Sequence, residues 1–110
     1  MSDRPKMKSD YRIVHKDGDG TTMRNLILMP LQERFFLTYG DDANRGVRLR
    51  TVDATDIEID NGKVSIIGFC QTEGCITRCR TERIHHLVVE ATGEEVMSDF
   101  ATWLVDRAKG

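Results

Sequence analysis

The sequence predicts a small, mainly β domain that ends in one α-helix. Several short segments alternate apolar and polar residues, as half-buried strands do. Asn61-Gly62 is the strongest two-residue hairpin signal in the chain. An apolar stripe with helical spacing lies near the C-terminus. At 110 residues the chain is expected to be one domain with an antiparallel sheet, because no strand–helix–strand units are visible.

The N-terminal third contains a hairpin signal and one ambiguous segment. Residues 1–10 lack the apolar stretch of a signal peptide, so we expect a flexible tail on a cytoplasmic protein. Within residues 11–33, an alternating segment precedes the turn signal Asp17-Gly-Asp-Gly20. Residues 21–29 then form either the return strand of a hairpin or a short helix stopped by Pro30. The turn residues favour the hairpin.

The middle of the chain is expected to be a run of strands. They cover residues 35–39, 47–52, 55–60, 63–70, 77–84 and 85–90. In the second of these, Val47, Leu49 and Thr51 share one face of the strand, while Arg48 and Arg50 share the other. Two sides of this strand therefore differ in chemistry.

The C-terminal segment predicts a helix that closes the sheet. Gly93 ends the β region, and the Ser98 hydroxyl can cap the helix by accepting a hydrogen bond from a first-turn amide. One helical face then carries Phe100, Trp103, Leu104 and Ala108. This stripe is expected to pack on the core rather than to bind a cofactor.

Three cysteines, Cys70, Cys75 and Cys79, lie within ten positions. An odd number without a secretion signal argues against a disulfide scaffold. Their spacing lacks the Cys-x2-Cys knuckle of most structural zinc sites, so we expect no metal and no cofactor. We expect Cys70 and Cys79 to be buried on neighbouring strands, with Cys75 at an exposed turn. A reversible Cys70–Cys79 bridge is the alternative, if the two strands pair nearly in register.

The charge pattern suggests local rather than global binding of anions. The formal net charge is −2, so no overall positive field attracts nucleic acid. Arginine supplies eleven of the sixteen basic residues and clusters in two segments, at positions 45, 48 and 50 and at positions 78, 80 and 83. Arginine grips phosphates and carboxylates with two parallel hydrogen bonds. No apolar run approaches the roughly 18 residues that cross a membrane, so no membrane contact is expected.

The order of several short motifs resembles the WYL domain family, small Sm-like β-barrels found mostly in bacterial transcription regulators. The motifs are Arg50-Thr-Val-Asp53, Gly68-Phe-Cys70, Thr77-Arg-Cys-Arg-Thr-Glu-Arg-Ile84 and Thr92-Gly-Glu94. The resemblance covers roughly residues 34 to 106 and implies that residues 34–110 form a small antiparallel Sm-like β-barrel with a closing helix. Ala54 replaces the family's proline, and Val64-Ser65-Ile66 replaces its naming tripeptide.

The resemblance implies a regulatory, ligand-sensing module. Such domains bind nucleotides or single-stranded nucleic acid through conserved arginines and the tyrosine of the tripeptide. The residues expected to bind an anionic ligand here are Arg48, Arg50, Ser65, Arg78, Arg80 and Arg83. Serine at the tyrosine position removes a stacking platform worth about 1–3 kcal/mol per base, so charge is expected to hold the ligand. The chain has no room for a helix-turn-helix, so a separate DNA-binding protein is the implied partner.

Two other interpretations of the arginines and the strands remain open. Arginines that alternate with apolar residues usually form a solvated outer face, on which Arg83 would pair with Glu58 or Asp53. Alternatively, exposed strand edges assemble the chain into a homo-oligomer. Catalysis is not expected, because His85 and His86 are adjacent and point to opposite faces of a strand, and no catalytic signature surrounds the cysteines.

Overall fold

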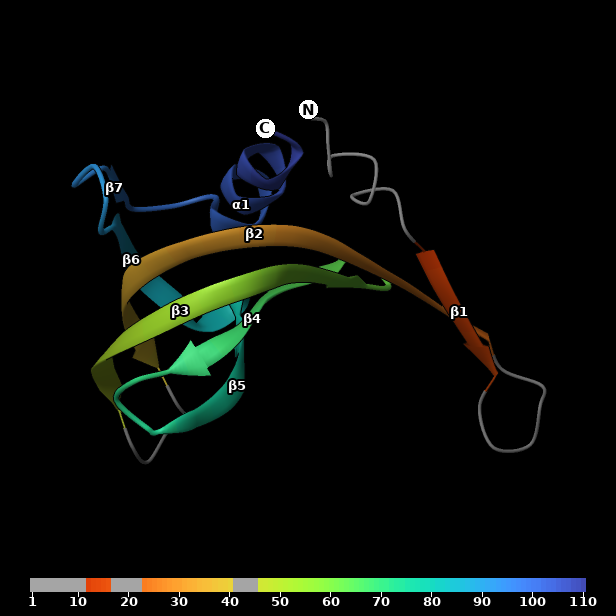
Figure 1. Cartoon of the computed structure of the whole chain (residues 1–110), viewed down its shortest axis with the longest axis horizontal. Coiled ribbons are helices and arrows are strands. Elements are labelled where there is room, and N and C mark those ends of the chain that lie inside the picture. Colours follow the sequence, from red (N-terminus) through yellow and green to blue (C-terminus); the bar gives the residue numbers. More distant parts are fainter. Residues whose placement is uncertain (1–11, 17–22, 41–45) are drawn as a thin grey trace.

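The structure of the protein, a computed structural model, describes residues 12–16, 23–40 and 46–110, with side chains from residue 26 onward. Its elements are β1 (Arg12–Lys16), β2 (Met23–Gly40), β3 (Val47–Asp60), β4 (Lys63–Cys70), β5 (Cys75–Arg80), the 3-10 helix η2 (Thr81–Arg83), β6 (Ile84–Val89), β7 (Glu95–Val96) and α1 (Phe100–Lys109) (Figure 1). The predicted mainly β domain with a C-terminal helix is confirmed. No helix in these ranges is long and apolar enough to cross a membrane.

The strands form one antiparallel sheet. Its hydrogen-bonded order is β5-β4-β3-β2-β6-β7, and β1 pairs with β2 beside this path. Within the described residues no pairing joins β5 to β6 or β7, so the ladder does not return on itself. In Figure 1 the sheet is strongly curled, with α1 lying over β2.

The N-terminal segment is a hairpin, in which Lys16 pairs with Met23. The hairpin alternative for residues 21–29 therefore holds from Met23 onward, and the helix does not form there. β2 then continues to Gly40, where the sequence predicted two separate elements. A register shift follows Pro30, which fits proline's lack of an N–H donor for a regular ladder. The predicted tail and the Asp17–Gly20 turn lie outside the described residues.

A second irregularity bends β3 against β4. The register shifts between Ala54 and Asp56, and Gly68 lies opposite Ala54. A Cβ added at Gly68 would lie 2.2 Å from the backbone oxygen of Asp53, so only glycine permits this close approach.

The closing helix seals the core as predicted. Phe100, Leu104 and Ala108 are buried, and Trp103 packs edge-to-face on Phe35 with ring centroids 6.2 Å apart. The expected Ser98 cap is wrong. The first helical hydrogen bond runs from the Trp103 N–H to the Asp99 carbonyl, because Asp99 adopts a left-handed backbone (φ 55°) and begins the helix one residue later.

The cysteines are free, with Cys70 and Cys79 buried and Cys75 exposed, as the sequence suggested. The alternative Cys70–Cys79 bridge is wrong. The β4–β5 register pairs Cys79 with Ile66 and Cys70 with Cys75. Cys79 therefore lies four residues along the ladder from Cys70, about 13 Å at strand spacing. A disulfide requires Cα atoms within about 7 Å.

Candidate functional site

The six expected ligand-binding residues lie in three places. Arg48 and Arg50 begin β3, Ser65, Arg78 and Arg80 lie on neighbouring β4 and β5, and Arg83 ends η2. The second group lines a common cleft. Arg83 is exposed and lines neither this cleft nor the β3 group.

Arg50 turns inward instead of lying on a solvated outer face. Its side chain is 10% exposed, whereas the Leu49 residue is 76% exposed. The Arg50 guanidinium carbon lies 5.0 Å from the ring centroid of Tyr39, within the range of a cation–π contact. One guanidinium nitrogen lies 3.6 Å from Glu73 Oε2, and Arg48 lies 3.7 Å from the same oxygen. Glu73 thus compensates the charge of both arginines, and this group fastens the β4–β5 turn to β3.

Tyr39 connects this group to the second arginine segment. Its ring makes the cation–π contact with Arg50, and its hydroxyl accepts a hydrogen bond from the Arg80 backbone N–H at 3.1 Å. β2 and β5 are not hydrogen-bonded neighbours in the sheet, so this contact spans the curl. Alternation predicts Tyr39 on a strand but gives no signal for this contact, because it joins residues 41 positions apart.

The second group lines a cleft of about 280 Å³. The sheet register places Glu58, Ser65 and Arg80 in one row across β3, β4 and β5. The cleft is bounded by the β3–β4 turn, β5, η2 and the first turn of α1. Its charged residues are Lys63, Arg78 and Arg80 with positive charge and Glu58, Asp60 and Glu82 with negative charge.

Arg78 is held by a buried carboxylate. Its Nε lies 2.9 Å from Glu58 Oε1, and a terminal nitrogen donates to Oε2 at 3.2 Å, so the pair is bidentate. The predicted pairing of Arg83 with Glu58 or Asp53 is wrong, because other arginines occupy both carboxylates. Asp53 pairs with Arg34 at 2.6 Å, and this contact together with the Gln71 amide lowers the pKa of Asp53.

Ser65 and Arg80 pair across β4 and β5. Ser65 is 5% exposed and lines the cleft. The Arg80 side chain is 54% exposed, and Glu82 approaches it only to 4.0 Å. The backbone of Arg80 is nevertheless fixed by Tyr39. The neighbouring Thr81 hydroxyl donates to the Val64 carbonyl at 3.0 Å, which anchors the other side of the cleft.

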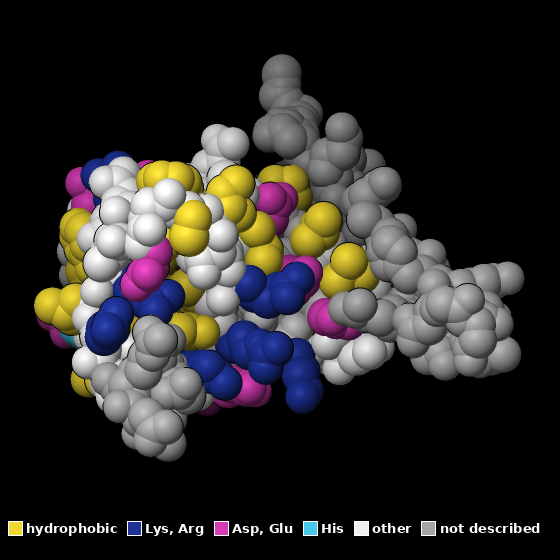
Figure 2. Space-filling view, turned by 90° about the horizontal axis from the view of Figure 1, so that it is seen from below, with side chains coloured by type: hydrophobic (Ala, Val, Ile, Leu, Met, Phe, Trp, Pro, Cys, Tyr) yellow, Lys and Arg dark blue, Asp and Glu magenta, His cyan; other side chains and the backbone are white. Residues whose placement is uncertain are grey.

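The cleft is mixed in charge. Seen from the side on which β5 lies, Lys and Arg side chains gather with Asp and Glu side chains among them (Figure 2). Positive and negative residues are equal in number along the lining. Such a lining supplies no net positive charge, and a guanidinium beside a hydroxyl can hold a phosphate group through directed hydrogen bonds. No group of three or more His, Cys, Asp or Glu that could hold a metal ion occurs in the described ranges.

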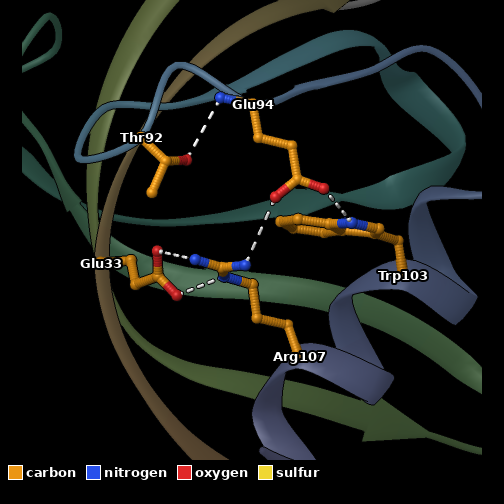
Figure 3. Close-up of polar contacts among 5 residues, drawn as sticks. All are labelled: Glu33, Thr92, Glu94, Trp103 and Arg107. Atoms are coloured by element: carbon orange, nitrogen blue, oxygen red, sulfur yellow. Dashed lines mark hydrogen bonds and ion pairs between the residues drawn. The ribbon is translucent and has the colours of Figure 1, made fainter.

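A second polar cluster, which we call the helix clasp, joins α1 to the sheet (Figure 3). It consists of Glu33, Thr92, Glu94, Trp103 and Arg107. Arg107 binds both oxygens of Glu33, and a further guanidinium nitrogen lies 3.6 Å from Glu94. Glu94 also accepts a hydrogen bond from the Trp103 indole at 3.3 Å, while its backbone N–H donates to Thr92. Arg107 lies over the Trp103 ring, 5.1 Å from its centroid.

Electrostatics in the helix clasp stabilises the charged guanidinium. Hydrogen bonding to Glu33 raises the pKa of Arg107, against a smaller opposing effect of burial. Sequence reasoning missed this cluster, although Trp103 and Arg107 are four residues apart on one helical face. Glu33 lies 74 positions earlier and gives no local signal. The charged groups of the clasp have their partners inside the chain.

Comparisons of the chain with models of protein families, with curated proteins and with solved structures find no match. The resemblance to WYL domains therefore depends on the order of the short motifs alone.

Proposed function

We propose that the protein is a non-catalytic regulatory module that binds a phosphate-bearing ligand, a nucleotide or single-stranded nucleic acid, in the cleft at Ser65 and Arg80. In this proposal the curled sheet is a diverged WYL-like, Sm-like barrel. The contact between Tyr39 and the Arg80 backbone supports the barrel, because it brings the ends of β2 and β5 together. A separate DNA-binding protein would convert ligand binding into transcriptional regulation.

One observation carries the proposal: the Arg80 side chain is 54% exposed, meets Glu82 only at 4.0 Å, and lines the same cleft as Ser65 on a backbone fixed by Tyr39. A phosphate oxygen would accept the Ser65 hydrogen bond and pair with the Arg80 guanidinium together. Lys63, exposed at the rim, adds a third donor.

The test is a calorimetric titration of the protein at low salt with inorganic phosphate, a mononucleotide and a single-stranded oligonucleotide. Arg80→Ala should lower phosphate affinity by at least tenfold, because it removes the least neutralised guanidinium of the cleft. Arg83→Ala is the matched control, since Arg83 has the same charge three residues away but lies outside the cleft. Equal losses in the two variants, or no binding by the wild type, would overturn the proposal.

A second candidate function is self-assembly through the β5 edge. Ile76 on β5 is 75% exposed and pairs across the strands with Phe69, which is also exposed. β5 ends the hydrogen-bonded order of the sheet, and in this candidate function the part of its outer edge that precedes Arg80 pairs with a strand of a second copy. Light scattering over a concentration series tests this function. A concentration-dependent increase in mass that Ile76→Lys abolishes supports it, and a monomer at all concentrations contradicts it.

A further inference from the structure

The charged cleft continues into an apolar depression beside α1. This depression has a volume of about 300 Å³ and is lined by Gly62, Val64, Ala101, Thr102, Val105 and Asp106. Gly62, Val64 and Ala101 line the charged cleft as well. The two hollows are therefore neighbours along the first turns of α1 and the β3–β4 turn.

Gly62, which lines both hollows, has open space beside it. A Cβ added at Gly62 would meet no atom within 4 Å. Gly62 has a positive φ of 84°, which the Asn61-Gly62 turn requires and which keeps this position without a side chain. The local turn chemistry thus leaves room beside the cleft.

The two hollows differ in chemistry. Ser65, Arg78 and Arg80 line only the charged cleft. The floor of the depression is supplied by Val64, Ala101 and Val105, which are buried or partly buried, while Thr102 and Asp106 are exposed at its rim. An apolar surface of this kind gains free energy when a ligand group displaces water from it.

We infer that the ligand is a small amphipathic phosphate monoester, with its phosphate at Ser65 and Arg80 and an apolar or aromatic body over Ala101 and Val105. The position of the phosphate group rests on the proposed function. The new part of the inference is the apolar or aromatic body of the ligand. Binding sites for small molecules commonly combine an apolar wall with a few polar groups that fix orientation. The balanced charge of the cleft favours such a compact ligand over a long polyanion.

The experiment compares inorganic phosphate with phenyl phosphate, which adds an apolar ring to the same head group. The wild-type protein should bind phenyl phosphate about tenfold more tightly, which corresponds to burial of about 50 Å² of apolar surface. Val105→Asn should remove this preference and leave the affinity for inorganic phosphate unchanged. Met97→Asn is the control, because Met97 is exposed and lines neither hollow.

The outcomes separate this inference from the proposed function. Equal affinities of the wild type for the two ligands would overturn the amphipathic class and leave phosphate binding intact. Loss of inorganic phosphate binding in Val105→Asn would also overturn it, since the substitution would then act on the whole site. No binding of either ligand would overturn both proposals. A ring preference that survives Val105→Asn would place the apolar body elsewhere and contradict the inference.

Discussion

The helix clasp and the charged cleft contain similar residue types but differ in how far those residues satisfy one another. In the helix clasp, Arg107 is shared by Glu33 and Glu94 and covered by Trp103. In the cleft, Arg78 is paired with Glu58, but the Arg80 side chain is 54% exposed and meets Glu82 only at 4.0 Å. Mixed charge alone therefore does not distinguish a structural cluster from a binding site.

The physical reason is how fully each charge is compensated within the chain. A guanidinium paired on several sides contributes to stability, whereas a half-exposed guanidinium is hydrated and can exchange water for an anionic ligand. The comparison predicts that substitutions in the helix clasp lower stability without affecting phosphate binding. Substitutions at Ser65 and Arg80 should do the reverse.

The largest effect on stability is expected for Arg107→Leu. It leaves Glu33 and Glu94 without their shared cation and removes the contact with Trp103. Because the ion pair is partly exposed, we expect a loss of about 2 kcal/mol in the free energy of unfolding, measured by urea denaturation. Phosphate affinity should stay unchanged. An unchanged denaturation midpoint would show that the clasp does not hold α1.

Glu58→Gln should affect both the stability and the phosphate affinity. The substitution removes the carboxylate that binds Arg78, at a cost of about 1 kcal/mol or less, because the Arg78 side chain is half exposed. It also releases the Arg78 guanidinium into the cleft and removes a negative charge. Phosphate affinity should therefore rise several-fold in calorimetric titrations. A decrease in affinity would mean that the Glu58–Arg78 pair itself shapes the phosphate site.

Ser65→Ala should leave the stability almost unchanged, within about 0.5 kcal/mol, because it removes one hydroxyl from the cleft lining and leaves the Arg78–Glu58 ion pair intact. The same substitution should weaken phosphate binding several-fold. Ser98→Ala, at an exposed serine outside both hollows, serves as the control. A loss of 1–2 kcal/mol in stability would show that the Ser65 hydroxyl has a partner within the folded chain.

The smallest effect is expected for Asp53, an exposed carboxylate whose hydrogen-bond donors lie within the chain, as in the helix clasp. Hydrogen bonds first from Arg34 and then from Gln71 lower the pKa of Asp53. The stabilising contribution of this carboxylate is therefore present above its ordinary pKa and is lost as the pH falls through the lowered value. Asp53→Asn should show a slightly shallower loss of thermal stability in acid than the wild type. A steeper loss would contradict the assigned direction.

Local sequence signals predicted the elements whose geometry is local. The Asn61-Gly62 turn forms as expected, with Asp60 paired to Lys63, and the apolar stripe of α1 is buried. The continuity of β2 through Pro30 was not predicted, because a proline usually interrupts a strand and here coincides with a register shift. The register that separates Cys70 from Cys79 also depends on pairing that alternation cannot determine.

The candidate site was predictable in part. Ser65, Arg78 and Arg80 lie on neighbouring strands, and motif order pointed to them together. Arg50 lies on a strand with the same alternation, but alternation does not show which face of the strand turns inward. In the structure the Arg50 side chain contacts Glu73 and Tyr39. The helix clasp joins Glu33 to Arg107 across most of the chain, so only the folded structure reveals it.

The most direct test is a titration of the 15N-labelled protein with inorganic phosphate, in which two-dimensional amide spectra are recorded at each step. The account predicts the largest shifts at the amides of Ser65, Arg80 and Thr81, with the Glu94 amide and the Trp103 indole N–H unmoved. Shifts that centre on Glu94 and Trp103 instead, or spectra that do not change at millimolar phosphate, would contradict it.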